Sequence, residues 1–149
     1  MGKLILSSLF LIAMLQFVAC DKGDDPPAQT EAQKVTALLI GSGASGSQWS
    51  LSSVFVDEVD YTEVFQGFTM TFSETGLTTT NGTVVFESTD GWNFKDEATA
   101  TQIVTDSGLE LTIDELTENQ LIFSFEFDET IYGRTSAVGG INVFTLNRP

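Results

Sequence analysis

Apolar and polar residues alternate with a period of two along most of the chain from Trp49 onward. The pattern is clearest at residues 68–72, 109–113 and 121–127, where threonine, serine or acidic residues separate phenylalanine, leucine, isoleucine and methionine. Successive side chains of a strand point to opposite faces, so this period predicts half-buried antiparallel strands. A helix would need an apolar period near 3.6, which this region lacks.

Turn-forming pairs separate these segments, namely Asn81-Gly82, Asp90-Gly91, Ser107-Gly108 and Glu118-Asn119. The predicted strands are 49–57, 65–73, 76–80, 83–88, 91–95, 101–105, 109–116, 120–128 and 141–147, of which the third and fourth form either a hairpin or one interrupted strand. Short connections favour an all-β, antiparallel up-and-down barrel of about eight strands over residues 49–149. An immunoglobulin-like sandwich is the alternative, but its Greek-key crossings need longer connections.

Residues 1–19 have the features of a secretory signal, with Lys3 before an apolar stretch that ends in small residues. The only cysteine of the chain, Cys20, follows directly. The segment Phe17-Val18-Ala19-Cys20 resembles the lipobox of bacterial lipoproteins, although leucine is usual at the position of Phe17. The resemblance implies that Cys20 is lipidated and anchors the protein in the lipid bilayer. An ordinary secretory signal is the alternative, and it leaves the position of the cysteine unexplained.

Three short segments are expected between the lipidated cysteine and the barrel. Residues 20–29 are acidic and contain two prolines, which predicts a flexible tether. Thr30 and Gln33 match a capping box, so residues 30–41 are predicted to form a short helix. Residues 42–48 are a glycine- and serine-rich linker.

The acidic tether also bears on location within the cell envelope. Acidic residues soon after the cysteine resemble the surface-export signals of some Gram-negative lipoproteins. An aspartate directly after the cysteine is associated instead with retention in the inner membrane. We prefer the outer membrane, and both a surface-exposed and a periplasmic orientation of the domain stay open.

Composition narrows the chemistry that the chain can perform. Without residues 1–19, five lysines and arginines face 21 aspartates and glutamates, a net charge of 5 − 21 = −16. This charge repels nucleic-acid phosphates and anionic headgroups, so neither is an expected partner. The chain has no histidine, the commonest zinc ligand and general base, and no second cysteine for a disulfide. We predict that the protein is not an enzyme and needs no cofactor.

Acidic and aromatic residues supply the remaining candidate sites. The stretch 57–63 holds four carboxylates, as a calcium site requires, but it lacks the glycine and the spacing of an EF-hand, and a solvated loop is the preferred interpretation. Trp92, Tyr61 and Tyr132 are candidates for stacking on sugars. Paired carboxylates for glycoside hydrolysis are disfavoured, because the strand pattern places most acids on the polar face.

Several short segments together resemble the lipocalin-like lipoproteins of Gram-negative bacteria, over about residues 34–148. They are Gly46-Ser47-Gln48-Trp49, residues 68–72, residues 78–82, Gly91-Trp92-Asn93-Phe94 and residues 143–148. In lipocalins, a tryptophan near the start of the first strand packs at the closed end of the barrel beneath an arginine that follows the last strand. Trp49 and Arg148 match these positions. The chain departs from the family in its shorter strands and in lacking a helix after the last strand.

The resemblance implies a membrane-anchored envelope lipoprotein whose barrel binds a small apolar ligand. The residues expected to line such a cavity share the apolar phase of their strands and are Phe68, Met70, Phe72, Leu111, Phe123 and Phe125. Because none of them is a carboxylate, histidine or thiol, no metal is expected among them. The alternative is a non-enzymatic structural or interaction lipoprotein in which the same residues form a solid core. A glycan-binding or hydrolytic accessory protein is a less favoured interpretation.

Overall fold

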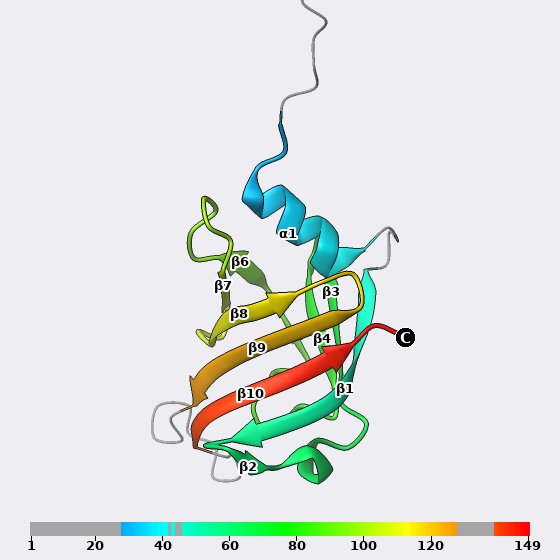
Figure 1. Cartoon of the computed structure of the whole chain (residues 1–149), viewed down its shortest axis with the longest axis vertical. Coiled ribbons are helices and arrows are strands. Elements are labelled where there is room, and N and C mark those ends of the chain that lie inside the picture. Colours follow the sequence, from blue (N-terminus) through cyan, green and yellow to red (C-terminus); the bar gives the residue numbers. More distant parts are fainter. Residues whose placement is uncertain (1–27, 42, 44–45, 128–138) are drawn as a thin grey trace, which may run out of the picture.

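The computed structural model describes residues 28–41, 43, 46–127 and 139–149 (Figure 1). The predicted signal, Cys20 and most of the predicted tether lie outside these residues. The elements are α1 (Glu31–Ile40), β1 (Ser47–Val56), β2 (Val59–Asp60), the 3₁₀ helix η1 (Thr62–Phe65), β3 (Thr69–Ser73), β4 (Gly76–Thr80), β5 (Thr89–Asp90), β6 (Trp92–Phe94), β7 (Gln102–Thr105), β8 (Glu110–Leu116), β9 (Gln120–Phe127) and β10 (Gly140–Asn147).

The strands form one antiparallel sheet in the order β5-β4-β3-β1-β10-β9-β8-β7-β6, with β2 paired separately to β1. The first and last long strands, β1 and β10, lie side by side, as in an up-and-down barrel. The strands at the two ends of this order, β5 and β6, are separated in sequence only by Gly91, so this bent segment nearly closes the barrel. The order contains nine strands, or eight if β5 and β6 are counted as one bent strand. The prediction of an all-β antiparallel barrel is confirmed.

The side chain of Trp92 stabilises the place where β5 and β6 meet and the barrel closes, which we call the seam. The indole Nε1 of Trp92 donates a hydrogen bond of 3.1 Å to the carbonyl oxygen of Ser73 on β3. Its ring packs edge-on against Phe72 and Phe94, with centroids 5.5 and 5.4 Å apart. Trp92 therefore contributes to barrel closure.

Burial along the strands follows the predicted period of two. In β9, the side chains of Leu121, Phe123, Phe125 and Phe127 are buried, whereas those between them are half-buried or exposed. In β1 the alternation changes phase, because the pairing with β10 shifts between Leu51 and Ser53. Ser52 is the extra residue of this bulge. One extra residue moves every following side chain of the strand to the opposite face of the sheet. Trp49 before the bulge and Val54 after it both point into the barrel.

Helix α1 covers one end of the barrel, and β2 and η1 lie at the opposite end (Figure 1). The helix begins with the predicted capping box, in which the backbone N–H groups of Thr30 and Gln33 each donate to the other's side chain, at 2.9 and 3.2 Å. It ends at Gly41, whose φ of +71° is one that L side chains rarely adopt. Leu39 and Ile40 in its last turn are buried against the barrel.

The prediction of a strand at 83–88 is wrong, and so is that of a two-residue hairpin at Asn81-Gly82. The backbone N–H groups of Val85 and Phe86 both donate to the carbonyl oxygen of Gly82, at 2.9 and 2.7 Å, which makes a turn. Both side chains are buried. Burying a phenylalanine contributes about 1.5–3 kcal/mol, whereas one backbone hydrogen bond contributes about 0.5–1.5 kcal/mol net. The turn keeps two backbone hydrogen bonds and buries both side chains, so the burial of Val85 and Phe86 offsets part of the strand pairing that this segment forgoes.

The remaining differences concern boundaries. Strand β1 begins at Ser47, inside the stretch predicted as linker, and the predicted strand 65–73 begins only at Thr69, after η1. The Asp90-Gly91 pair bends the chain between β5 and β6, where a chain reversal was expected. The turns at Ser107-Gly108 and Glu118-Asn119 connect β7 to β8 and β8 to β9, as predicted.

Candidate functional site

The six residues expected to line a cavity come together inside the barrel. Phe68 directly precedes β3, and the others lie on β3, β8 and β9. All six side chains are buried, and the most exposed of them, Phe125, has a relative exposure of 4 %. They belong to one hydrophobic cluster that also includes Leu39 of α1 and Leu146 of β10.

Phenylalanine rings fill the middle of this cluster. The ring of Phe144, on β10, lies at the centre, with five other rings around it at centroid distances of 5.0 to 5.7 Å. These five rings belong to Phe65, Phe68, Phe86, Phe123 and Phe125. Such distances are those of aromatic rings in direct contact. The rings therefore occupy the space between the strands.

Phe65, Phe86 and Phe144 were missed as interior residues by the sequence analysis. Phe144 shares the inward phase of β10 with Leu146, so the alternation along that strand could have identified it. Phe65 and Phe86 lie outside the strands, in η1 and in the segment 81–88, which we call the plug loop. No period-two signal places residues of such segments inside a barrel.

The plug loop fits closely against the rings at Gly82. A Cβ atom added there would lie 2.6 Å from Cε2 of Phe68 and 3.3 Å from Cδ2 of Phe86. The first distance is shorter than real Cβ contacts, so even one methyl group requires the rings to move. The loop is thus packed to the density expected of a protein core.

We predict that Gly82→Ala destabilises the domain by about 1–3 kcal/mol, the usual cost of overpacking a core, in a urea titration followed by intrinsic fluorescence. Gly43→Ala is the matched control, because the nearest described atom to a Cβ there is the Gly46 carbonyl oxygen, at 3.8 Å. The control should retain the wild-type stability or gain slightly through lower unfolded-state entropy. Equal stability of both variants would contradict a closely packed plug loop.

Trp49 and Arg148 meet at the end of the barrel covered by α1. The Arg148 guanidinium carbon lies 4.2 Å from the centroid of the Trp49 ring, a cation–π arrangement. Trp49 is fully buried, and its Nε1 donates a 3.0 Å hydrogen bond to the carbonyl oxygen of Leu39. Arg148 Nη2 donates to the carbonyl oxygen of Leu38. The last carbonyls of a helix have no partner within the helix, so the two side chains attach α1 to the barrel.

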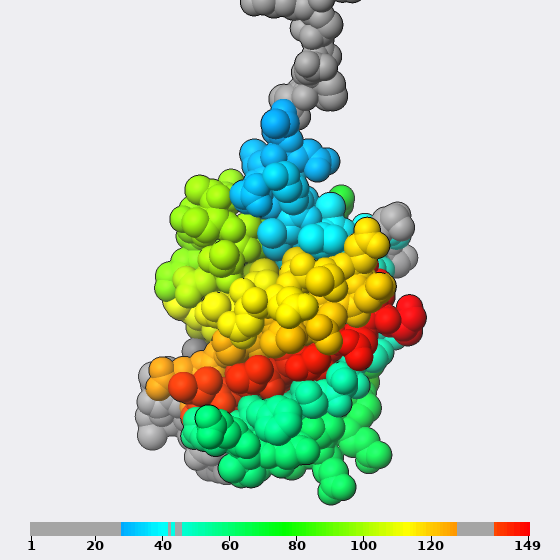
Figure 2. All heavy atoms as spheres, in the orientation of Figure 1, coloured from blue at the N-terminus to red at the C-terminus, as the bar shows by residue number. Residues whose placement is uncertain are grey.

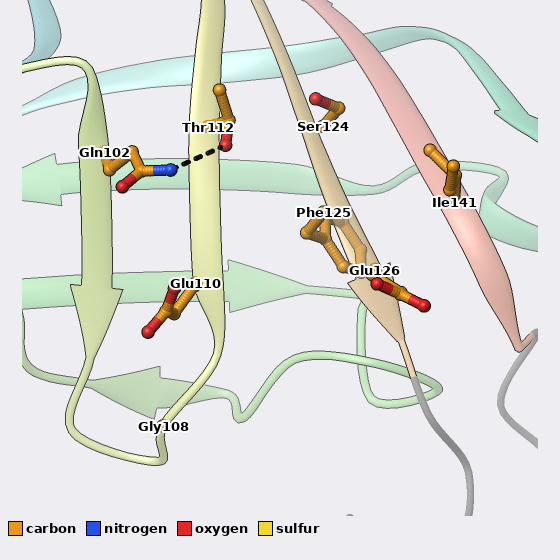
Figure 3. A pocket seen from close by; sticks show the side chains of 8 residues that line it. All are labelled: Gln102, Gly108, Glu110, Thr112, Ser124, Phe125, Glu126 and Ile141. Carbon is orange, nitrogen blue, oxygen red and sulfur yellow. Dashed lines mark hydrogen bonds between the residues drawn. The ribbon is translucent and has the colours of Figure 1, made fainter.

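Four hollows of the described surface lie outside the barrel. One, of about 490 Å³, extends over β7 to β10 and is lined mainly by polar side chains, among them Gln102, Thr112 and Ser124 (Figure 3). Another, of about 610 Å³, lies between α1 and Phe94. Of the six cavity candidates, Phe125 alone borders one of these four hollows.

The acidic stretch 57–63 uses two of its carboxylates to bind backbone. Asp57 Oδ1 accepts a 3.0 Å hydrogen bond from the N–H of Ile141, and Asp60 Oδ1 accepts one of 2.8 Å from the N–H of Thr62. Hydrogen bonds from the side chain and the backbone of Thr62 lower the pKa of Asp60 below its ordinary value. Among the described residues, no group of three or more His, Cys, Asp or Glu side chains is placed to hold a metal ion.

Of the candidate sugar-stacking residues, Trp92 is half-buried in the seam and Tyr61 is packed against the core. Tyr132 lies outside the described residues.

None of the helices in the described part of the chain has the length and apolar character needed to cross a bilayer. In comparisons with protein-family models, curated proteins and solved structures, nothing matches the chain.

Proposed function

We propose that this chain is a membrane-anchored envelope lipoprotein with a lipocalin-like barrel that has a solid core and serves as a non-enzymatic interaction domain. The observation that carries the proposal is the contact of Phe144 with five other phenylalanine rings. Sites for small molecules are hollows of about 300–1,000 Å³. A barrel filled with contacting rings supplies a stable scaffold and leaves recognition to its outer surface.

The anchor is the lipidated Cys20, which precedes the first described residue, Ala28, by 28 − 20 = 8 positions. A fully extended chain of that length spans at most roughly 26–29 Å. Helix α1 begins at Glu31, three residues after Ala28, and covers the end of the barrel that is nearer to the anchor. With two or three acyl chains in the bilayer, attachment is effectively permanent. We place the protein in the outer membrane, with the far end of the barrel directed away from the lipid surface.

The main alternative is a carrier of a small apolar ligand. A carrier would have to move several of the contacting rings apart to make room, with loss of their mutual packing. The plug loop adds to this cost, because Gly82 and Phe86 pack directly on Phe68. A solid barrel needs no such rearrangement, and we therefore prefer the interaction domain.

Replacing Phe123 by tryptophan tests the interior. We expect the larger ring to cost about 1–3 kcal/mol of stability, since it enters a filled core. The wild-type protein should show no saturable binding of a fluorescent fatty acid. Phe55→Trp is the matched control, because Phe55 is 40 % exposed on the outer face of β1 and its replacement should change stability by less than about 0.5 kcal/mol.

The carrier alternative makes the opposite prediction for the same proteins. Saturable fatty-acid binding by the wild type, abolished in Phe123→Trp while stability is retained, would show a cavity at this position. That result would replace the proposed interaction domain by a ligand-binding lipoprotein.

A further inference from the structure

The large exposed hydrophobic side chains of the described chain lie on four adjoining elements of the barrel. They are Phe55 on β1, Val59 on β2, Val64 in η1 and Ile141 on β10, with relative exposures of 40, 58, 53 and 57 %. These elements adjoin one another, since β1 pairs with both β2 and β10 and contacts η1. Figure 2 shows β9, β10, β1 and β2 as adjacent bands on the face turned toward the viewer.

Strand register makes the apolar residues and the surrounding carboxylates neighbours. Phe55 lies opposite Val143 on one side and opposite Asp60 on the other. Ile141, two residues before Val143, lies opposite Glu126 of β9. Side chains directly opposite one another are about 4.5–5.5 Å apart at Cβ, and diagonal ones about 7–8 Å, so these residues form a continuous strip.

Acidic residues border this strip closely. Asp57, Glu58, Asp60, Glu63 and Glu126 are all exposed and lie on or beside β1, β2, η1 and β9. Val59 lies opposite the buried Val56, on the other side of the β1–β2 pair. We call these five acidic residues, together with Phe55 and Ile141, the acidic apolar face. None of β1, β2, η1, β9 and β10 contains a lysine or arginine.

The basic residues of the described chain are engaged elsewhere. Lys34 forms an ion pair of 2.7 Å with Glu31 on α1, and Lys95 forms one of 2.6 Å with Glu110. Arg148 lies over Trp49 at the end of the barrel covered by α1. The acidic apolar face therefore combines exposed apolar side chains with negative charge that no cation of its own elements balances.

We infer that the acidic apolar face binds a partner protein through a basic amphipathic segment, in which apolar side chains are flanked by lysines and arginines. This inference rests on the proposed role as an interaction domain and names its surface and partner. Charge complementarity selects the partner, because cationic side chains would neutralise the five carboxylates while the apolar strip is removed from water. A second copy of the chain would present the same negative charge, and an anionic lipid surface would be repelled.

The position of the face suits such a partner. Residues of β2 and η1 lie at the end of the barrel opposite α1, and hence opposite the side from which the tether enters (Figure 1). With the anchor at Cys20, a partner could reach this end without competing with the membrane. Exposed apolar patches with a polar rim are typical of protein-binding surfaces.

The test uses the full lipidated protein in phosphatidylcholine nanodiscs, with empty nanodiscs to subtract adsorption of the probe to lipid. The probe is a synthetic helix of roughly 16 residues with a leucine stripe flanked by lysines, and its counterpart carries glutamate in place of each lysine. We expect saturable binding of the lysine peptide with a Kd in the micromolar range, weakened by added salt, and no binding of the glutamate peptide.

Two triple variants separate this face from general acidity. Glu58→Gln, Glu63→Gln and Glu126→Gln together remove three charges from the face, and Glu74→Gln, Glu97→Gln and Glu118→Gln together remove three exposed charges elsewhere. The first should weaken lysine-peptide binding about tenfold, and the second less than about twofold. Ile141→Thr keeps a β-branched residue on β10, reduces the apolar strip and should also weaken binding several-fold.

Equal weakening by both triple variants would overturn the inference, because it would reduce binding to overall acidity. So would equal binding of the two peptides, or no saturable binding of the lysine peptide. Failure of this inference would be distinguishable from failure of the proposed function. Fatty-acid binding and the stability of Phe123→Trp report on the barrel interior alone, whereas peptide binding reports on the outer surface.

Discussion

Replacing Cys20 by serine is expected to abolish stable membrane attachment of the protein. The lipobox-like segment ends at this residue, and serine offers no thiol for acylation. Each buried CH₂ of an acyl chain contributes about 0.8 kcal/mol, so loss of two or three chains removes more free energy than a single surface contact can replace. The measurement is fractionation of cells into membrane and soluble material, followed by immunoblotting of a tagged chain.

Gln16→Ser, within the apolar stretch of the signal, is the control and should leave attachment unchanged, because serine already occurs at Ser7 and Ser8. Retention of the Cys20→Ser protein in the membrane fraction after a high-salt wash would contradict the anchor. Loss of attachment with normal folding of the barrel would support it.

Replacing Trp49 by alanine should have the largest effect on the stability of the folded domain, roughly 3 to 5 kcal/mol, as for other buried aromatic residues cut back to alanine. The indole is fully buried, donates to the carbonyl oxygen of Leu39 and lies beneath Arg148. Its removal leaves a cavity and removes one of the two side-chain hydrogen bonds that attach the end of α1 to the barrel. Denaturant unfolding followed by circular dichroism gives the change in free energy.

Gln48→Ala is the matched control, because Gln48 neighbours Trp49 on β1 and is exposed. Its effect should lie within about 0.5 kcal/mol of the wild type. A Trp49→Ala midpoint close to the wild-type value would mean that the helix-covered end contributes little to stability. The barrel would then depend mainly on the phenylalanine cluster at its centre.

The strands could be predicted from sequence because their signal is local. Along β9, the alternation of Leu121, Phe123, Phe125 and Phe127 with more polar residues shows which face is buried. The start of α1 was equally predictable, since the capping box joins Thr30 to a residue only three positions away. In both cases, neighbours along the chain carry the whole pattern.

The plug loop, in contrast, was predicted wrongly as a strand. Its run of β-branched and aromatic residues, Thr83-Val84-Val85-Phe86, is compatible with a strand, and the Asn81-Gly82 pair is a common hairpin turn. Phe86 is instead buried against Phe68 and Phe144, and those residues are 18 and 58 positions away in the chain (86 − 68 and 144 − 86). Packing between such distant residues leaves no local signature.

The sequence by itself determined most of the half-buried strands, the short helix and the inward phase of β3, β8 and β9, because each depends on the geometry of a few consecutive residues. Only the tertiary structure decided how that interior is occupied, since Phe65 and Phe86 reach it from segments outside the strands. It also decided which exposed residues share a surface, because Phe55 and Ile141 become neighbours through the pairing of the first and last long strands. Strand pairing and loop packing depend on contacts across the whole chain, and the local sequence pattern does not contain them.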